Sequence, residues 1–207
     1  MSRLRQGINP ASVTLIDTMN ALSAPTPWDD PQPLLDEHPP SAAVDDFRDA
    51  MARLAGGVGV LTTRDPVSRD CGITVTALSS VSLVPPLVLT CVRRGGFVHD
   101  ALVVADGWAL TMLADDQLDL ARYAARHRHP GSRDDFSPWR VRRGADSGAL
   151  IFTGGVSAVE CVPYELVDAG DHTVAIGRVV AVADDLVGRN PLAYVDRRYH
   201  ATGDALS

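Results

Sequence analysis

The chain has 207 residues, of which 45% are hydrophobic and 22% charged, and its formal net charge is −7. This composition is typical of a soluble globular protein of one domain, and the acidic balance argues against a general nucleic-acid binder, which needs positive charge to neutralise phosphates. All 19 basic residues are arginine, which excludes Schiff-base chemistry on lysine and a Walker A phosphate loop.

Targeting and metal-binding signals are not evident in the sequence. No apolar run approaches the roughly 20 residues that span a bilayer, and the N-terminus lacks the apolar segment of a secretory signal. The three cysteines, Cys71, Cys91 and Cys161, do not have the spacing of a disulfide framework or a zinc site. We therefore expect a cytoplasmic protein with no metal and no membrane partner.

The first 40 residues differ in composition from the rest. They hold seven of the 14 prolines, which disfavours helices and central strands. We interpret residues 1–40 as a Pro-rich N-terminal extension, disordered or serving as a dimer arm, and residues 41–207 as the folded domain. A helix is expected over 42–55, with Ser41 as N-cap and an apolar face made by Val44, Phe47, Met51 and Leu54.

Residues 71–92 read CGITVTALSSVSLVPPLVLTCV and carry the clearest pattern in the chain. Alternation from Gly72 to Leu78 predicts a strand with Ile73, Val75 and Ala77 on its core face and hydroxyls on the other face. Leu87–Val92 is almost wholly apolar, as in a strand buried on both faces. The hydroxyl row either faces water without a role or binds the phosphate tail of a flat ligand.

The remaining pattern predicts many short strands and few helices. Helices are expected over 97–105 and 117–126, and a hairpin turn over 168–171. Strands are expected over 58–63, 108–113, 149–152, 156–167, 172–183 and 192–195. This order favours a mainly β fold with peripheral helices, an antiparallel β-barrel of α+β type.

Three segments together resemble the short-chain flavin reductase family, the reductase components of two-component flavin-dependent monooxygenases. These are TVTALSSVSLVPPLVLTCV, the earlier FRDAMARLAGGVGVLTT, and the tripeptide GDH at 170–172. The resemblance implies the split-barrel flavin-binding fold, a homodimer, and the activity of an NAD(P)H:flavin oxidoreductase. It also implies FMN or FAD as the flavin, NADH or possible NADPH as hydride donor, and a separate monooxygenase that receives the reduced flavin.

The resemblance also assigns candidate site residues. It implies nicotinamide contacts from Gly170, Asp171, His172 and Thr173, with His172 as the catalytic candidate, because an imidazole can donate a proton near neutral pH. It implies flavin contacts from Thr74, Val75, Thr76, Ala77, Leu78, Ser82, Leu83, Cys91, Val92, Arg93, Arg94, Gly95 and Gly96.

The turn after Arg94 departs from the family pattern. The family commonly has hydroxyl residues where this chain has Gly95 and Gly96, whose backbone N–H groups remain free to bind an anion. The departure leaves open the choice between FMN and FAD, and whether the chain is a flavin-binding carrier or partner subunit without reductase activity. A third alternative is a split barrel that holds another cofactor, such as haem.

Several side chains carry two interpretations each. Phe136 and Tyr199 match family positions that could cover the ring, but Phe136 could equally anchor the long loop 127–147. His172 could be a turn histidine bonded only to Asp171. An arginine cluster could receive a dinucleotide phosphate, although a solvated basic surface is the simpler interpretation; it comprises Arg122, Arg126, Arg128, Arg133, Arg140, Arg142 and Arg143.

Overall fold

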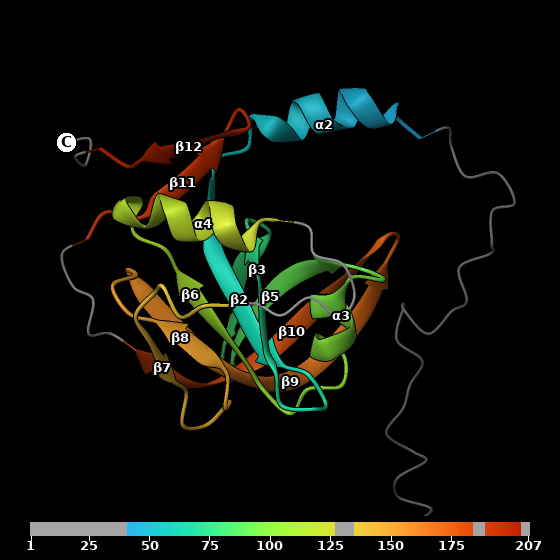
Figure 1. Cartoon of the computed structure of the whole chain (residues 1–207). Helices are drawn as coiled ribbons and strands as arrows, with labels where there is room; N and C mark the ends of the chain where they lie inside the picture. The colour runs from blue at the N-terminus through green and yellow to red at the C-terminus, as the bar shows by residue number, and fades with distance from the viewer. Residues whose placement is uncertain (1–40, 127–134, 184–188, 204–207) are drawn as a thin grey trace, which may run out of the picture. The chain divides into compact units, whose positions relative to one another are not determined.

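The computed structural model describes residues 41–126, 135–183 and 189–203, so our interpretation of residues 1–40 lies outside the described residues. From Val44 onward the chain forms one compact unit (Figure 1). Its elements in chain order are α2 (Val44–Ala52), β1 (Gly56–Gly57), β2 (Gly59–Arg64), β3 (Asp70–Val75), β4 (Leu78–Leu83), β5 (Pro86–Arg93), α3 (Phe97–Leu102), β6 (Trp108–Met112), η1 (Asp115–Gln117), α4 (Leu118–Ala124), β7 (Val141–Arg143), β8 (Leu150–Phe152), β9 (Ser157–Ala169), β10 (His172–Ala183), β11 (Leu192–Val195) and β12 (Arg198–Ala201).

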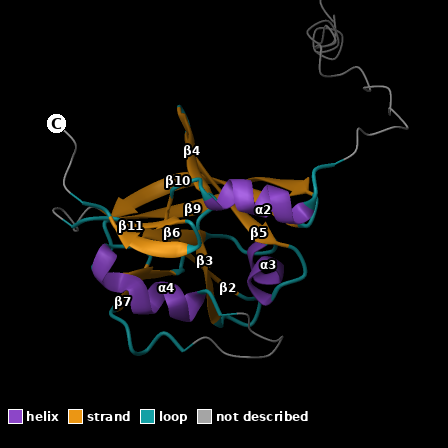
Figure 2. Cartoon of the chain, turned by 90° about the horizontal axis from the view of Figure 1, so that it is seen from above, coloured by secondary structure: helices purple, strands orange, loops and turns teal. Residues whose placement is uncertain are grey.

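The main sheet has seven antiparallel strands in the order β3-β2-β6-β9-β10-β5-β4. Its two edge strands, β3 and β4, are consecutive in the chain, so the sheet curls until its edges approach one another. Helices α3 and α4 flank β2 and β3 (Figure 2). The mainly β fold with peripheral helices is confirmed, and two short strand groups, β1-β11-β12 and β7-β8, complete it.

The core inside the curled sheet is tightly packed. Trp108, Leu61 and Leu110 are almost fully buried there. Gly177 on β10 lies against the Trp108 ring, because a Cβ at this position would come within 2.3 Å of Trp108 Cζ2. A larger residue at 177 would therefore displace the indole, so close packing here requires glycine.

One carboxylate is buried away from both the sheet edges and the strand ends. Glu160 on β9 is 4% exposed and accepts hydrogen bonds from the backbone N–H groups of Asp146 and Ser147, at 3.0 and 2.8 Å, and from the Ser147 hydroxyl. Burial alone would raise the pKa of this carboxyl, but these hydrogen bonds hold it below its usual range. Glu160 thus fixes the loop before β8.

The helix expected over 42–55 forms as α2, but its apolar face does not enter the core. None of its residues is buried, and Phe47 is 59% exposed. Two hydrogen bonds hold the helix to the rest of the chain. The Asp196 N–H donates to the carbonyl of Ala52 at the C-terminal end of the helix, and the Arg197 guanidinium donates to Asp49 on its polar side. The periodicity identified the helix correctly, and its apolar face is exposed in the single chain.

The central segment also differs from expectation in detail. Strand β3 ends at Val75, so Ala77 is exposed and not part of the core face. Strand β5 is not buried on both faces, since only Thr90 and Val92 are buried along it. Strands β1, β7 and β12 were not predicted, because two to four residues are too few to show an alternating pattern.

None of the helices in the described part of the chain is long and apolar enough to cross a membrane.

Candidate functional site

Three segments that are distant in sequence meet at the C-terminal end of β5. His172, the first residue of β10, lies directly opposite Arg93 in the β5-β10 register. The backbone N–H of Cys91 donates to the carbonyl of Ala77 across a distance of 3.1 Å. The predicted flavin and nicotinamide segments are therefore neighbours on adjacent strands.

The register also sorts these residues by face. Residues directly opposite each other share a face, and alternate residues along a strand do too. Ala77, Cys91, Arg93 and His172 therefore lie on the outer face of the curled sheet. Val92 and its partner Thr173 lie on the inner face, where they are 3% and 4% exposed.

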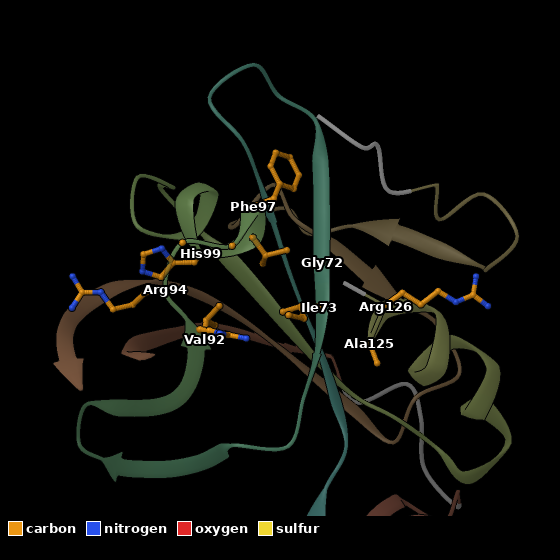
Figure 3. A pocket seen from close by; sticks show the side chains of 12 residues that line it. Gly72, Ile73, Val92, Arg94, Phe97, His99, Ala125 and Arg126 are labelled. Carbon is orange, nitrogen blue, oxygen red and sulfur yellow. The ribbon is translucent and has the colours of Figure 1, made fainter. Parts of the chain in front are cut away.

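A cavity of about 330 Å³ opens at this strand end (Figure 3). It lies between β3 on one side and the turn from β5 into α3 on the other, and the end of α4 closes it. Its lining residues are Gly72, Ile73, Val92, Arg93, Arg94, Gly95, Gly96, Phe97, Val98, His99, Ala125 and Arg126. Five of the predicted flavin contacts, from Val92 to Gly96, thus line one cavity.

The turn between β5 and α3 is shaped by glycine. Gly95 has a φ of +73°, a left-handed conformation that glycine adopts without steric cost. An added Cβ at Gly95 would meet no atom within 4 Å. The space beside the turn is therefore open to a ligand.

Three contacts fasten the β9-β10 hairpin to this turn and to α3. The Arg94 N–H donates to the Asp171 carbonyl at 3.0 Å, and the Arg94 guanidinium lies 3.3 Å from the Asp168 carboxylate. Deeper inside, His99 Nε2 lies 3.0 Å from the Thr173 hydroxyl. The hairpin that carries His172 is thus held to the cavity wall.

His99 on α3 occupies both of its ring nitrogens. Its side chain is 13% exposed, and Nδ1 lies 3.1 Å from a carboxylate oxygen of Asp100. A carboxylate accepts hydrogen bonds only, so Nδ1 donates to Asp100, and Nε2 forms a hydrogen bond with the Thr173 hydroxyl. The sequence analysis did not single out His99; its position just after the glycine turn, on an expected helix, was the available signal.

His172 itself is half-exposed on the outer face. Its Nδ1 lies 2.8 Å from the Asp171 carboxylate, and the hydrogen bond and charge of His172 hold the pKa of Asp171 below its usual range. This is the contact expected of a turn histidine. It fixes one side of the ring and leaves Nε2 for a ligand on the outer face.

The hydroxyl row is used mainly within the fold. Thr74 donates to the Ala121 carbonyl of α4 at 2.7 Å, and the Ser82 hydroxyl accepts from the Val84 N–H. Val75 is buried in the core and Thr76 is exposed. Leu78, Ser82 and Leu83 line a second, mostly apolar cavity at the other end of β5, so the structure does not bring them to the site with His172.

Phe136 and Tyr199 are not among the residues that line the cavity. Phe136 is 4% exposed and its ring contacts Phe152 edge-on with 5.2 Å between centroids, which agrees with the alternative that it anchors the loop; a role in covering a ligand ring stays a prediction. Tyr199 contacts Tyr194 edge-on and packs against the same core cluster. Burial of Tyr199 raises its pKa.

The arginine cluster is dispersed. Arg143 forms two hydrogen bonds of 2.8 Å with the Asp70 carboxylate, whereas Arg126 lines the cavity. Arg128 and Arg133 lie outside the described residues.

Histidine, cysteine and acidic side chains are spread over the described ranges. These residues contain no group of three or more histidine, cysteine or acidic side chains placed to hold a metal ion. All three cysteines are free thiols, and burial raises the pKa of Cys161 to about 12, which makes it unreactive.

Comparisons with known proteins agree on one family. The family model described as "Flavin reductase like domain" matches residues 51–203. The actinorhodin polyketide dimerase of Streptomyces coelicolor is 37% identical over 155 residues, which are 75% of this chain and 84% of that protein.

Two solved structures have the same fold. The NADH:FAD oxidoreductase of Streptomyces globisporus superposes with a TM-score of 0.72 at 31% identity, covering 80% of this chain and 100% of that one. The flavin reductase component of a bacterial two-component tryptophan halogenase gives a TM-score of 0.70 at 29% identity, covering 78% and 99%.

Proposed function

The chain belongs to the flavin reductase-like family, and on that premise we propose that it is an NADH-dependent flavin reductase that supplies reduced FMN or FAD to a separate monooxygenase. The observation that carries the proposal is the register at the end of β5. It places the glycine turn, Cys91 and His172 on adjacent strands, as a flavin and a nicotinamide stacked on one another require.

The residues of the chain have defined tasks in this reaction. A bound flavin supplies the hydride-accepting chemistry, so the protein must bind, orient and shield, and needs no nucleophile. Ala77 and Cys91 contribute small side chains to the surface beneath a ring, and the turn 93–96 offers arginine and the backbone N–H groups of Gly95 and Gly96 to its phosphate. His172, held by Asp171, presents Nε2 to the nicotinamide.

The proposal is tested by following NADH oxidation with no flavin, with FMN and with FAD. We expect consumption only when flavin is present, and His172→Ala is expected to lower kcat/KM for NADH by about 10- to 100-fold. His200→Ala, which removes an exposed histidine on β12, is the matched control and should leave the rate unchanged. Flavin binding without NADH consumption by the unmodified chain would instead identify a carrier.

We further propose a homodimer, because the chain exposes several large apolar side chains close together, as protein–protein interaction surfaces do. The apolar stripe on α2 and the turn that follows it (Val44, Phe47 and Met51, with Leu54 after the helix) is 45–65% exposed, and Leu83 and Val84 at the β4-β5 turn are 85% and 92% exposed. A second copy of the same chain can bury these surfaces symmetrically.

We place the enzyme in the cytoplasm. All three cysteines are unpaired, as expected in a reducing compartment, and the proposed donor and acceptor are cytoplasmic metabolites.

A further inference from the structure

Arg94 holds the turn between β5 and α3 to the β9-β10 hairpin in two ways. Its backbone N–H donates to the carbonyl of Asp171 at 3.0 Å, and its guanidinium lies 3.3 Å from the Asp168 carboxylate. The first contact joins backbone atoms and does not depend on where the side chain points. The side chain of Arg94 can therefore change its partner while the hairpin stays fastened to the turn.

The ion pair between Arg94 and Asp168 is exposed to solvent. The side chain of Arg94 is 47% exposed and that of Asp168 is 72% exposed. Such a pair contributes little to stability, because water and salt screen the charges and both side chains lose freedom when they pair. An acceptor that binds the guanidinium more strongly can therefore displace the carboxylate.

Arg94 is also placed to meet the phosphate of a flavin. It lines the cavity at the end of β5, and Figure 3 shows its guanidinium turned away from the centre of that cavity. Arg93 belongs to β5 and lies opposite His172, whereas Gly95 and Gly96 have no side-chain donor. The charge within the turn itself therefore comes from Arg94, and a guanidinium binds a phosphate through two parallel hydrogen bonds.

Asp168 has a different place in the hairpin from Asp171. Asp171 fixes the ring of His172, whose Nδ1 lies 2.8 Å from its carboxylate. Asp168 lies opposite Thr173 in the β9-β10 register, and within the described chain its carboxylate pairs with Arg94 and with no other side chain. Its charge is thus not needed to hold the hairpin or to orient His172.

We propose that Asp168 competes with the flavin phosphate for Arg94 and thereby weakens flavin binding. In the free protein the carboxylate neutralises the guanidinium. When a flavin binds, its phosphate takes the place of the carboxylate, and Asp168 turns to solvent. The inference rests on the proposed function and deepens it, because it names a residue that sets how strongly the flavin is held.

FMN and riboflavin are a matched pair of ligands for the test, because they differ only in the phosphate group. The Kd of each is measured by fluorescence titration with the unmodified chain and with Asp168→Asn. The variant should bind FMN about 2- to 5-fold more tightly, the range expected when an exposed ion pair no longer competes. The Kd for riboflavin should not change. A gain in affinity is a result that damage to the fold does not produce.

Two further variants isolate the competition from the change in net charge. Glu165→Gln removes one negative charge from the same hairpin, at a residue that lies opposite Ile176 and not at Arg94, and should leave the Kd for FMN unchanged. Arg94→Ala should weaken FMN binding, and adding Asp168→Asn to it should give no gain, because the competition requires the guanidinium. The gain in the single variant should also shrink at high ionic strength.

Three results would overturn the inference. They are an unchanged or higher Kd for FMN in Asp168→Asn, an equal gain for FMN and riboflavin, and a gain that persists without the Arg94 guanidinium. Failure of the proposed function is distinct, since it appears as absent NADH oxidation by the unmodified chain when flavin is supplied, whereas the titrations measure binding alone.

Discussion

Helices α2 and α3 differ in a way that their sequences do not reveal. The stripe on α2 is the stronger amphipathic pattern, yet no residue of α2 is buried. The shorter α3 buries Ala101 and Leu102 and is fixed to β10 through His99 and Thr173. An apolar stripe indicates that a surface will be covered, but it does not say by which molecule.

The comparison assigns the two helices to different kinds of partner. α3 forms part of a wall whose polar groups are satisfied within the chain and whose cavity has the size of a small ligand. The stripe of α2 is flat and apolar, as expected of a surface that meets another protein. Variants in each region should therefore affect different measurements.

The largest effect is expected from Phe47→Asp on α2. Burial of a phenylalanine side chain contributes about 1.5–3 kcal/mol, and a symmetric dimer contains it twice. The dimer dissociation constant should therefore rise by roughly 10²- to 10⁴-fold, measured by analytical ultracentrifugation. Arg48→Asp, on the polar side of the same helix, is the control; if it dissociates the dimer equally, α2 is not the interface.

An intermediate effect is expected from His99→Leu on α3. The substitution leaves the buried Thr173 hydroxyl without its partner, which costs about 1–3 kcal/mol, and it frees the hairpin that carries His172. The KM for NADH should rise roughly 5- to 10-fold with a smaller change in kcat. His99→Gln, whose amide can reach Thr173, should recover part of the loss, and an unaltered KM in both variants would refute a positioning role.

The smallest effect is expected from Glu160→Gln, which touches neither helix. The free energy of unfolding should fall by about 1–2 kcal/mol, with the dimer and flavin affinity unchanged. Because the pKa of Glu160 is lowered in the fold, its contribution is complete above the unfolded pKa of about 4.3 and disappears as the pH falls through the folded pKa. Urea unfolding at pH 7 and below pH 4 should show this difference between wild type and variant shrinking with acid.

Much of the fold follows from local patterns in the sequence. The barrel, the two strands of the β9-β10 hairpin and the strand after Pro85 were predicted. Alternation of apolar residues and turn-forming residues determine local structure within a few positions, so they can be recognised in sequence. The neighbourhood of Arg93 and His172 agrees with the family resemblance, and their register was not readable from either segment alone.

The errors arise where a distant part of the chain decides the outcome. The Thr74 hydroxyl was expected to face a ligand, but the carbonyl of Ala121 accepts its hydrogen bond. The two interpretations of Phe136 could not be separated from sequence, because its buried partner Phe152 lies 16 positions later in the chain. His99 was missed because its role depends on Thr173, which is 74 positions later in the chain.

The outer face at the end of β5 is open to solvent within one chain, with 43% of the His172 side chain exposed. A molecule bound on this face stays in contact with solvent and dissociates directly into it. The product of such an enzyme is used by another protein. On an open surface of this kind, the affinity for the reduced flavin sets how long the flavin stays bound. Weak binding of the reduced flavin is then an advantage, because the flavin leaves after each turnover and carries its electrons to the monooxygenase.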